Sequence, residues 1–196
     1  GHGVVGVGQR VPGVVHEHGP VAEPGERVTE RLPGELGALP GEVAIGHLAD
    51  RYPKALAVDH EELDITDRAA VEAFDWDKVD VIINAAAYTN VDGAQTPEGR
   101  VATWSVNAQA VANLARVATE YELTLVHVSS ETVYDGTRGN HKEDEPVAPL
   151  GVYAQSKAAG DMAAQVVPKH YIVRTMWLIG EGHKQDEIEG RKADAN

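Results

Sequence analysis

Leu123-Thr-Leu-Val-His-Val-Ser-Ser130 and His170-Tyr-Ile-Val-Arg174 are two apolar, β-branched runs that flank a helical segment at 152–166. Short runs of this composition are typical of buried strands. Two strands joined through a helix form a right-handed crossover in a parallel sheet. The stretch 123–174 therefore predicts an α/β fold.

The same alternation of strand and helix extends upstream. Strand-like runs occur at 55–59 and 79–84, and a helix capped by a threonine is expected at 66–74. A longer helix begins at Thr96-Pro97 and carries an apolar stripe that includes Val101, Trp104 and Leu114. This alternation predicts a doubly wound parallel sheet of the Rossmann-like type.

Residues 1–47 differ in composition from the rest of the chain. They hold 11 of the 20 glycines and five of the 10 prolines, and such frequent turn residues interrupt helices and central strands. We expect an irregular segment here, including a loop at Gly3-Val-Val-Gly6-Val-Gly8.

The 196-residue chain carries a formal net charge of −14 and contains no cysteine. The negative charge repels nucleic acids and anionic membranes, and a chain without cysteine forms no disulfide and no thiolate metal site. No apolar run is long enough to span a bilayer. His16 and His18 have no further ligand at metal-binding spacing, so we expect no metal. These features favour a cytoplasmic protein that binds neither nucleic acid nor membrane.

Ser130, Tyr153 and Lys157 form a candidate catalytic group. Tyr153 and Lys157 are four residues apart and share a helix face, where the ammonium can lower the pKa of the phenol. Ser130 ends the preceding strand and can hydrogen-bond the same substrate oxygen. The group predicts carbonyl reduction with tyrosine as the proton donor. For the Tyr–Lys pair alone, the alternative is a half-buried ring beside a solvated ammonium.

Other candidate residues follow the carboxyl ends of the strands, where ligands bind in such sheets. Asp59 can accept hydrogen bonds from ribose hydroxyls, and the small side chains at 84–89 let a flat cofactor approach the backbone. Trp177 follows the last strand. Each has a structural alternative, because strand-end carboxylates often cap turns and a tryptophan often fills a core.

Five longer phrases occur in a characteristic order. They are Asn84-Ala-Ala-Ala-Tyr-Thr-Asn-Val-Asp92, Val106-Asn107, Val126-His-Val-Ser-Ser-Glu-Thr-Val-Tyr-Asp-Gly136, Gly151-Val-Tyr-Ala-Gln-Ser-Lys157 and Val173-Arg-Thr-Met-Trp177. Together they resemble the dTDP-4-dehydrorhamnose reductase family of the extended short-chain dehydrogenase/reductase superfamily. The run Phe74-Asp-Trp-Asp-Lys-Val-Asp80 is most similar to the reductase half of actinobacterial epimerase–reductase fusions.

The resemblance implies reduction of the 4-keto group of dTDP-4-dehydrorhamnose to dTDP-L-rhamnose, with hydride from NADPH or NADH. Tyr153 would donate the proton, Lys157 would lower its pKa and hold the nicotinamide ribose, and Ser130 would take the usual serine/threonine place. The residues implied to contact the dinucleotide are Asp64, Ile65, Ala86, Ala87 and Tyr88, and those implied to contact the sugar nucleotide are Glu131 and Trp177. The protein partners to be expected are a second copy of the chain and dTDP-4-dehydrorhamnose 3,5-epimerase, as a fusion or pathway partner.

Both ends of the chain depart from the family. Members begin with a strand and a glycine-rich phosphate loop, which we do not recognise before Leu48, and they continue with a substrate-binding domain where this chain ends at Asn196. The expected division is a Gly/Pro-rich segment without family resemblance (1–47), a partial dinucleotide-binding reductase domain (48–182) and a divergent tail (183–196). We expect a truncated or inactive reductase that binds NAD(P)H weakly or not at all. The alternatives are a non-catalytic nucleotide-sugar-binding or regulatory subunit on the same scaffold, and another reductase or epimerase of the superfamily.

Overall fold

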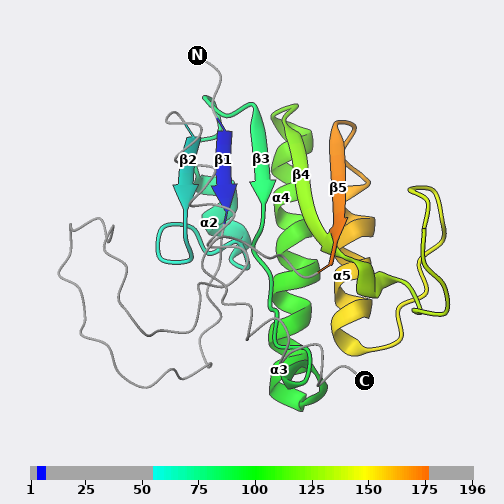
Figure 1. The fold of residues 1–196 in the computed structure, drawn as a ribbon. Coiled ribbons are helices and arrows are strands. Elements are labelled where there is room, and N and C mark those ends of the chain that lie inside the picture. Colours follow the sequence, from blue (N-terminus) through cyan, green and yellow to red (C-terminus); the bar gives the residue numbers. More distant parts are fainter. Residues whose placement is uncertain (1–3, 8–54, 177–196) are drawn as a thin grey trace, which may run out of the picture.

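The computed structural model describes residues 4–7 and 55–176. Within these ranges five strands form one sheet in the order β2-β1-β3-β4-β5 (Figure 1). Each pair of neighbouring strands is parallel, as the alternating sequence pattern predicts. The strands are β1 (Val4–Val7), β2 (Ala55–Val58), β3 (Val81–Asn84), β4 (Thr124–Ser130) and β5 (His170–Thr175).

Strand β1 lies where the sequence predicts a loop. Its residues were predicted to form a loop, but Val4–Val7 pairs with β2 on one side and with β3 on the other. Val5 and Val7 are buried in the sheet. So short a strand, bordered by glycines, has no periodicity of its own, and its pairing partners lie far along the chain. The prediction that no strand precedes Leu48 is therefore wrong.

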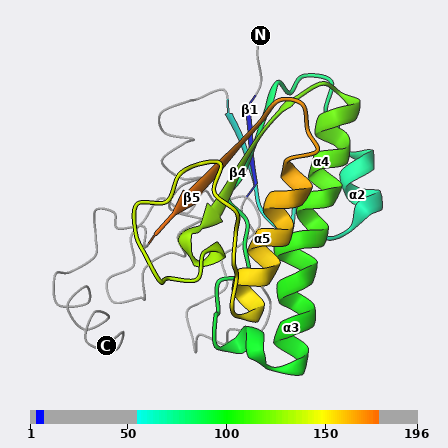
Figure 2. The same cartoon turned by 90° about the vertical axis from the view of Figure 1, so that its right-hand side faces the viewer.

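The helices of the described ranges cover one face of the sheet (Figure 2). They include α2 (Arg68–Ala73), α4 (Ala110–Glu120) and α5 (Val152–Ala164). The connections β2 to β3, β3 to β4 and β4 to β5 all step in the same direction across the sheet. Right-handed crossovers that step in one direction place their helices on one face.

The long helix predicted from Thr96-Pro97 consists of three consecutive elements. They are α3 (Pro97–Trp104), a π-helical turn η2 (Ser105–Gln109) and α4. The predicted apolar stripe is wrong at its beginning, because Val101 and Trp104 are exposed. The wider π turn shifts the phase of the helix, so Thr103 and Asn107 are buried instead.

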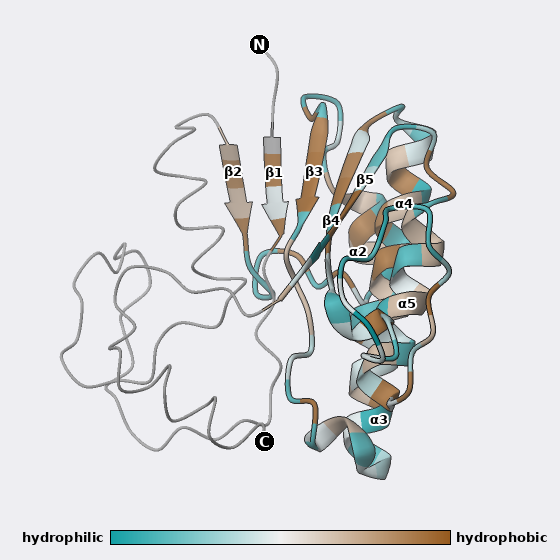
Figure 3. Cartoon of the chain, turned by 45° about the vertical axis from the view of Figure 1, so that its right-hand side comes forward, coloured by the Kyte–Doolittle hydropathy of each residue, from teal (hydrophilic) through white to brown (hydrophobic). Residues whose placement is uncertain are grey.

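The core lies between the sheet and the helices. Ile82 and Leu125 from the strands pack with Val71 of α2 and with Val111 and Leu114 of α4. Figure 3 shows that β3 is hydrophobic along most of its length and hydrophilic at its carboxyl end. Two 3-10 turns complete the described elements, η1 (Gly93–Gln95) and η3 (Glu131–Val133). No helix within the described ranges is long and apolar enough to cross a membrane.

Candidate active site

Ser130 and Tyr153 lie together at the carboxyl end of β4. Ser130 is buried, and its hydroxyl donates to Glu131 Oε2 (3.0 Å) and accepts from the amide and hydroxyl of Thr132 (3.2 and 3.0 Å). The phenol of Tyr153, in the first turn of α5, lies close enough to the Ser130 hydroxyl for that hydroxyl to lower its pKa. The structure thus brings together a serine and a tyrosine from distant parts of the sequence, with a carboxylate beside them.

Lys157 follows Tyr153 by one turn of α5 and is also buried. Its Nζ donates to the carbonyl oxygen of Val128 in β4 (2.7 Å). Burial lowers the pKa of Lys157 to about 8, and the negative charge of Asp161 raises it in part. A lysine in this state can both hold and release a proton near neutral pH.

The pKa of Tyr153 corrects one expectation. Burial raises the pKa of the phenol, the Glu131 carboxylate raises it further, and the nearby Ser130 hydroxyl lowers it only in part. Lys157 was expected to lower this pKa, but its ammonium is turned to Val128 and the net direction is upward. In the free chain Tyr153 is therefore held in its protonated form.

Asn107 links the end of β3 to α5. Its Oδ1 accepts from the amide of Tyr88 (2.8 Å), and its Nδ2 donates to the Tyr88 carbonyl (3.1 Å) and to Ser156 Oγ (3.0 Å). Ser156 in turn donates to the main-chain carbonyl of Tyr153 (2.6 Å). The close packing of η2 against α5 needs a glycine at position 160, because a Cβ on Gly160 would lie 2.2 Å from the Asn107 carbonyl oxygen.

Asn107 is part of the phrase Val106-Asn107, but no role was predicted for it. The helix pattern itself shows only a polar side chain within the buried face of a long helix. Its partners lie 19 and 49 residues away, so the helix pattern alone could not identify them.

A second polar group lies where β4, α5 and β5 pack together. His127 Nδ1 is 3.2 Å from Asn84 Nδ2, and His127 Nε2 is 3.9 Å from Asp161 Oδ1. The other oxygen of Asp161 accepts from Arg174 Nε at 2.9 Å. Burial lowers the pKa of His127 well below its ordinary value, and the charge of Lys157 lowers it further. His127 is therefore neutral.

The predicted adenosine-side residues lie after β2. Asp59 is exposed, and its Oδ1 accepts from the amides of Glu61 and Glu62, so it caps the turn. Partial burial raises the pKa of Asp64, but hydrogen bonds from Thr66 and the charge of His60 leave it below its ordinary value. Ile65 is fully buried in the core. It can therefore contact a ligand only through its main chain.

The remaining predicted residues follow β3 or lie further along the chain. Ala86 and Tyr88 are buried, and Ala87 is half-buried. Glu131 is half-buried beside Ser130. Trp177 lies outside the described residues. Within the described ranges no three histidine or acidic side chains are grouped as metal ligands.

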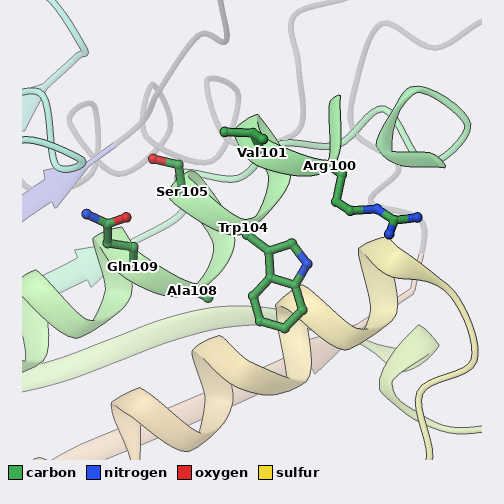
Figure 4. Close-up of a pocket in the computed structure, with 6 residues that line it drawn as sticks. All are labelled: Arg100, Val101, Trp104, Ser105, Ala108 and Gln109. Atoms are coloured by element: carbon green, nitrogen blue, oxygen red, sulfur yellow. The ribbon is translucent and has the colours of Figure 1, made fainter. Parts of the chain in front are cut away.

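A surface hollow on α3 and η2 is lined by none of the predicted site residues (Figure 4). It is lined by side chains of one continuous helix, α3 and η2, and none of them belongs to β4 or α5. The lining residues are Arg100, Val101, Trp104, Ser105, Ala108 and Gln109. The hollow carries none of the candidate catalytic groups.

Comparison with known proteins identifies relatives of this arrangement. The family model described as "RmlD substrate binding domain" matches residues 32–188, a range that begins within the Gly/Pro-rich segment. A dTDP-4-dehydrorhamnose reductase of Aggregatibacter actinomycetemcomitans is 40% identical over 151 residues, which are 76% of this chain and 50% of the relative. One from Mycobacterium tuberculosis is 39% identical over 139 residues, 68% of this chain and 45% of the relative.

A solved structure gives the same picture. The dTDP-4-dehydrorhamnose reductase of Bacillus anthracis in complex with NADP superposes with a TM-score of 0.65 and 27% identity, covering 78% of this chain and 57% of that one. The chain thus spans about half the length of the curated relatives that it matches.

Proposed function

The chain belongs to the RmlD substrate binding domain family, and from that premise we propose that it carries the catalytic residues of an NAD(P)H-dependent reductase for the 4-keto group of dTDP-4-dehydrorhamnose. One observation carries the proposal: Tyr153 lies close enough to Ser130 for the serine hydroxyl to affect the pKa of the phenol, and Lys157 is buried one turn away on the same helix. A general acid, a hydroxyl for the substrate oxygen and a nearby cation are the groups that carbonyl reduction requires.

The described residues fit a dinucleotide laid along the carboxyl edge of the sheet. From β2 to β4 this edge crosses three strand spacings, roughly 14 Å, with β1 and β3 between. After β3, Ala86 and Ala87 have no side-chain atom beyond Cβ, so a flat ring can approach the main chain. Asp59, Asp64 and the main chain of Ile65 would then hold the adenosine end. Tyr88, Tyr153 and Lys157 would hold the nicotinamide end.

When bound, NADPH or NADH supplies the hydride that adds to the keto carbon. Ser130 would exchange its hydrogen bond with Glu131 for one to the keto oxygen, and Tyr153 would donate its proton to that oxygen. The raised pKa of Tyr153 keeps the proton in place until the oxygen becomes basic. Lys157 would turn from the Val128 carbonyl to stabilise the phenolate that remains and, with a pKa of about 8, could return a proton to it.

Further parts of the proposal concern the substrate and partners. The sugar nucleotide would contact Glu131 and Trp177, and the reductase region would comprise 48–182. A second copy of the chain and dTDP-4-dehydrorhamnose 3,5-epimerase are the proposed protein partners, and the cytoplasm is the proposed location. Strand β1 supplies the strand that was expected to be missing before Leu48. The glycine-rich loop would follow it outside the described residues, so weak NAD(P)H binding stays a prediction.

Tyr153→Phe tests the mechanism. In a protein extended at both ends to the length of its relatives, we expect turnover to fall by about two to four orders of magnitude, the usual contribution of a general acid. NADPH affinity should change little, because phenylalanine keeps the aromatic ring. The matched control is Tyr171→Phe, because Tyr171 is an exposed tyrosine of β5. Undiminished turnover in Tyr153→Phe would mean that another group donates the proton. Saturable NADPH binding without any reduction by the unaltered chain would favour the non-catalytic binding subunit.

A further inference from the structure

Asp161 is a buried carboxylate that the proposed reaction does not use. It lies on α5, one turn beyond Lys157, and its side chain is almost completely buried. Arg174 donates to Oδ2, whereas Oδ1 has no hydrogen-bond partner within the described ranges. Burying a charged oxygen without a hydrogen bond is unfavourable. A compensating interaction of another kind is therefore to be expected.

His127 faces the free oxygen but does not supply that compensation. Asn84 Oδ1 accepts from the amide of Ala86, so its Nδ2 is the group that points to His127 Nδ1. Nδ1 must then be the acceptor, and the proton of the neutral ring lies on Nε2. At 3.9 Å from Asp161 Oδ1, Nε2 is too distant for a hydrogen bond, and both atoms lack a partner within the described ranges.

The charges around Lys157 indicate which group Asp161 serves. Tyr153 from α5 and His127 from β4 are neutral. Glu131 from η3 raises the pKa of the Tyr153 phenol. Arg174 from β5 donates to the far oxygen of Asp161. Lys157 is a buried cation whose described hydrogen bond goes to an uncharged carbonyl. Asp161 is the carboxylate that favours its charged form.

We propose that Asp161 is a positioning residue for Lys157, whose carboxylate, oriented by Arg174, keeps the buried ammonium charged at the reaction site. The inference rests on the proposed function for the role of Lys157, but its test does not depend on catalysis. The structural alternative is that the Asp161–Arg174 pair only fastens α5 to β5.

The test measures the titration of Lys157 in the full chain. The protein is labelled with ¹³C-lysine, the Cε resonance of Lys157 is identified by its absence from Lys157→Met, and its shift is followed with pH. In Asp161→Asn we expect the pKa of Lys157 to fall by about one unit or more, the usual effect of an opposite charge nearby. Asp161→Glu, which keeps the charge, should retain a pKa near that of the unaltered chain.

Arg174→Gln separates the two roles. It breaks the same ion pair as Asp161→Asn and should destabilise the fold in the same sense. However, it leaves the carboxylate without a competing cation, so the pKa of Lys157 should rise. The control is Glu72→Gln, which removes an exposed carboxylate paired with Arg68 on α2 and should leave the titration unchanged.

Opposite shifts in Asp161→Asn and Arg174→Gln would support the proposal. An unchanged pKa in Asp161→Asn, or shifts in the same direction in both variants, would overturn it. If Asp161→Asn does not fold, Arg174→Gln decides: a rise supports the proposal, and a fall or no change contradicts it. A lack of reductase activity would count against the proposed function and leave this titration valid.

Discussion

The two halves of the sheet bury different kinds of side chain. Around β1, β2 and α2 the interior is apolar, and the largest side chains there include Val7, Ile65, Val71 and Trp76. Polar side chains in this half cap exposed turns, as Asp67 does for α2. Around β4 and α5 the interior holds a concentration of polar and charged groups: His127, Ser129, Ser130, Ser156, Lys157 and Asp161.

This difference separates two ways of building a fold. In the apolar half each side chain stabilises the fold through the apolar surface that it removes from water, and this effect has no preferred direction. In the polar half each group needs a partner of suitable geometry, and removing one group leaves another unpaired. Substitutions in the first half should therefore lower stability alone, whereas those in the second should also change hydrogen bonding and titration.

Trp76→Ala should give the largest loss of stability. Trp76 is buried, its ring packs against Phe74 with centroids 4.6 Å apart, and its Nε1 donates to the Val71 carbonyl at 2.8 Å. Truncation of a buried tryptophan lowers the free energy of unfolding by about 3–5 kcal/mol, measurable by urea denaturation. Trp104→Ala, at an exposed position of α3, should lower it by less than about 1 kcal/mol. Equal losses would contradict the assignment of Trp76 to the core.

Asn107→Ala tests the polar half in the same assay. The substitution leaves the amide and carbonyl of Tyr88 without their side-chain partner. From about 1–3 kcal/mol for each unsatisfied buried group, we expect a total loss of at least about 2 kcal/mol. Asn113→Ala is the control, because Asn113 makes chiefly one bond, to the Ile65 carbonyl at 2.9 Å, and should lose about 1 kcal/mol. A smaller loss for Asn107 than for Asn113 would show that the link between β3 and α5 contributes little.

Much of the fold was predictable because its signals are local. The runs at 55–59, 79–84 and 123–128 differ from the observed strands by only a few residues at their ends. The spacing of Tyr153 and Lys157 also predicts their place on one helix, which the structure confirms. Each of these features depends on neighbours within a few positions.

The features that were missed depend on distant parts of the chain. Strand β1 is defined by its pairing with β2 and β3. The exposure of Trp104 follows from the π turn η2, which the residue types at 105–109 do not predict. The roles of His127 and Asp161 arise where β4, α5 and β5 pack together. The pKa of Tyr153 is raised for the same reason. It depends on the burial of the ring, and the spacing of Tyr153 and Lys157 in the sequence does not reveal that burial.

The smallest expected effect concerns His127 and the pH dependence of stability. Burial lowers the pKa of His127 in the folded chain below its ordinary value of 6.5. At a pH between the pKa of the folded chain and 6.5, the unfolded chain therefore binds a proton that the folded chain does not. The contribution is therefore fully present above about pH 6.5 and is lost as pH falls, by up to about 1.4 kcal/mol per pH unit. His127→Gln removes this proton, so its free energy of unfolding should fall less steeply between pH 6.5 and 5. Above pH 7 the curves of the two proteins should run parallel. Identical slopes below pH 6.5 would show that His127 is not held neutral and that the polar half does not differ from the apolar half in its response to acid.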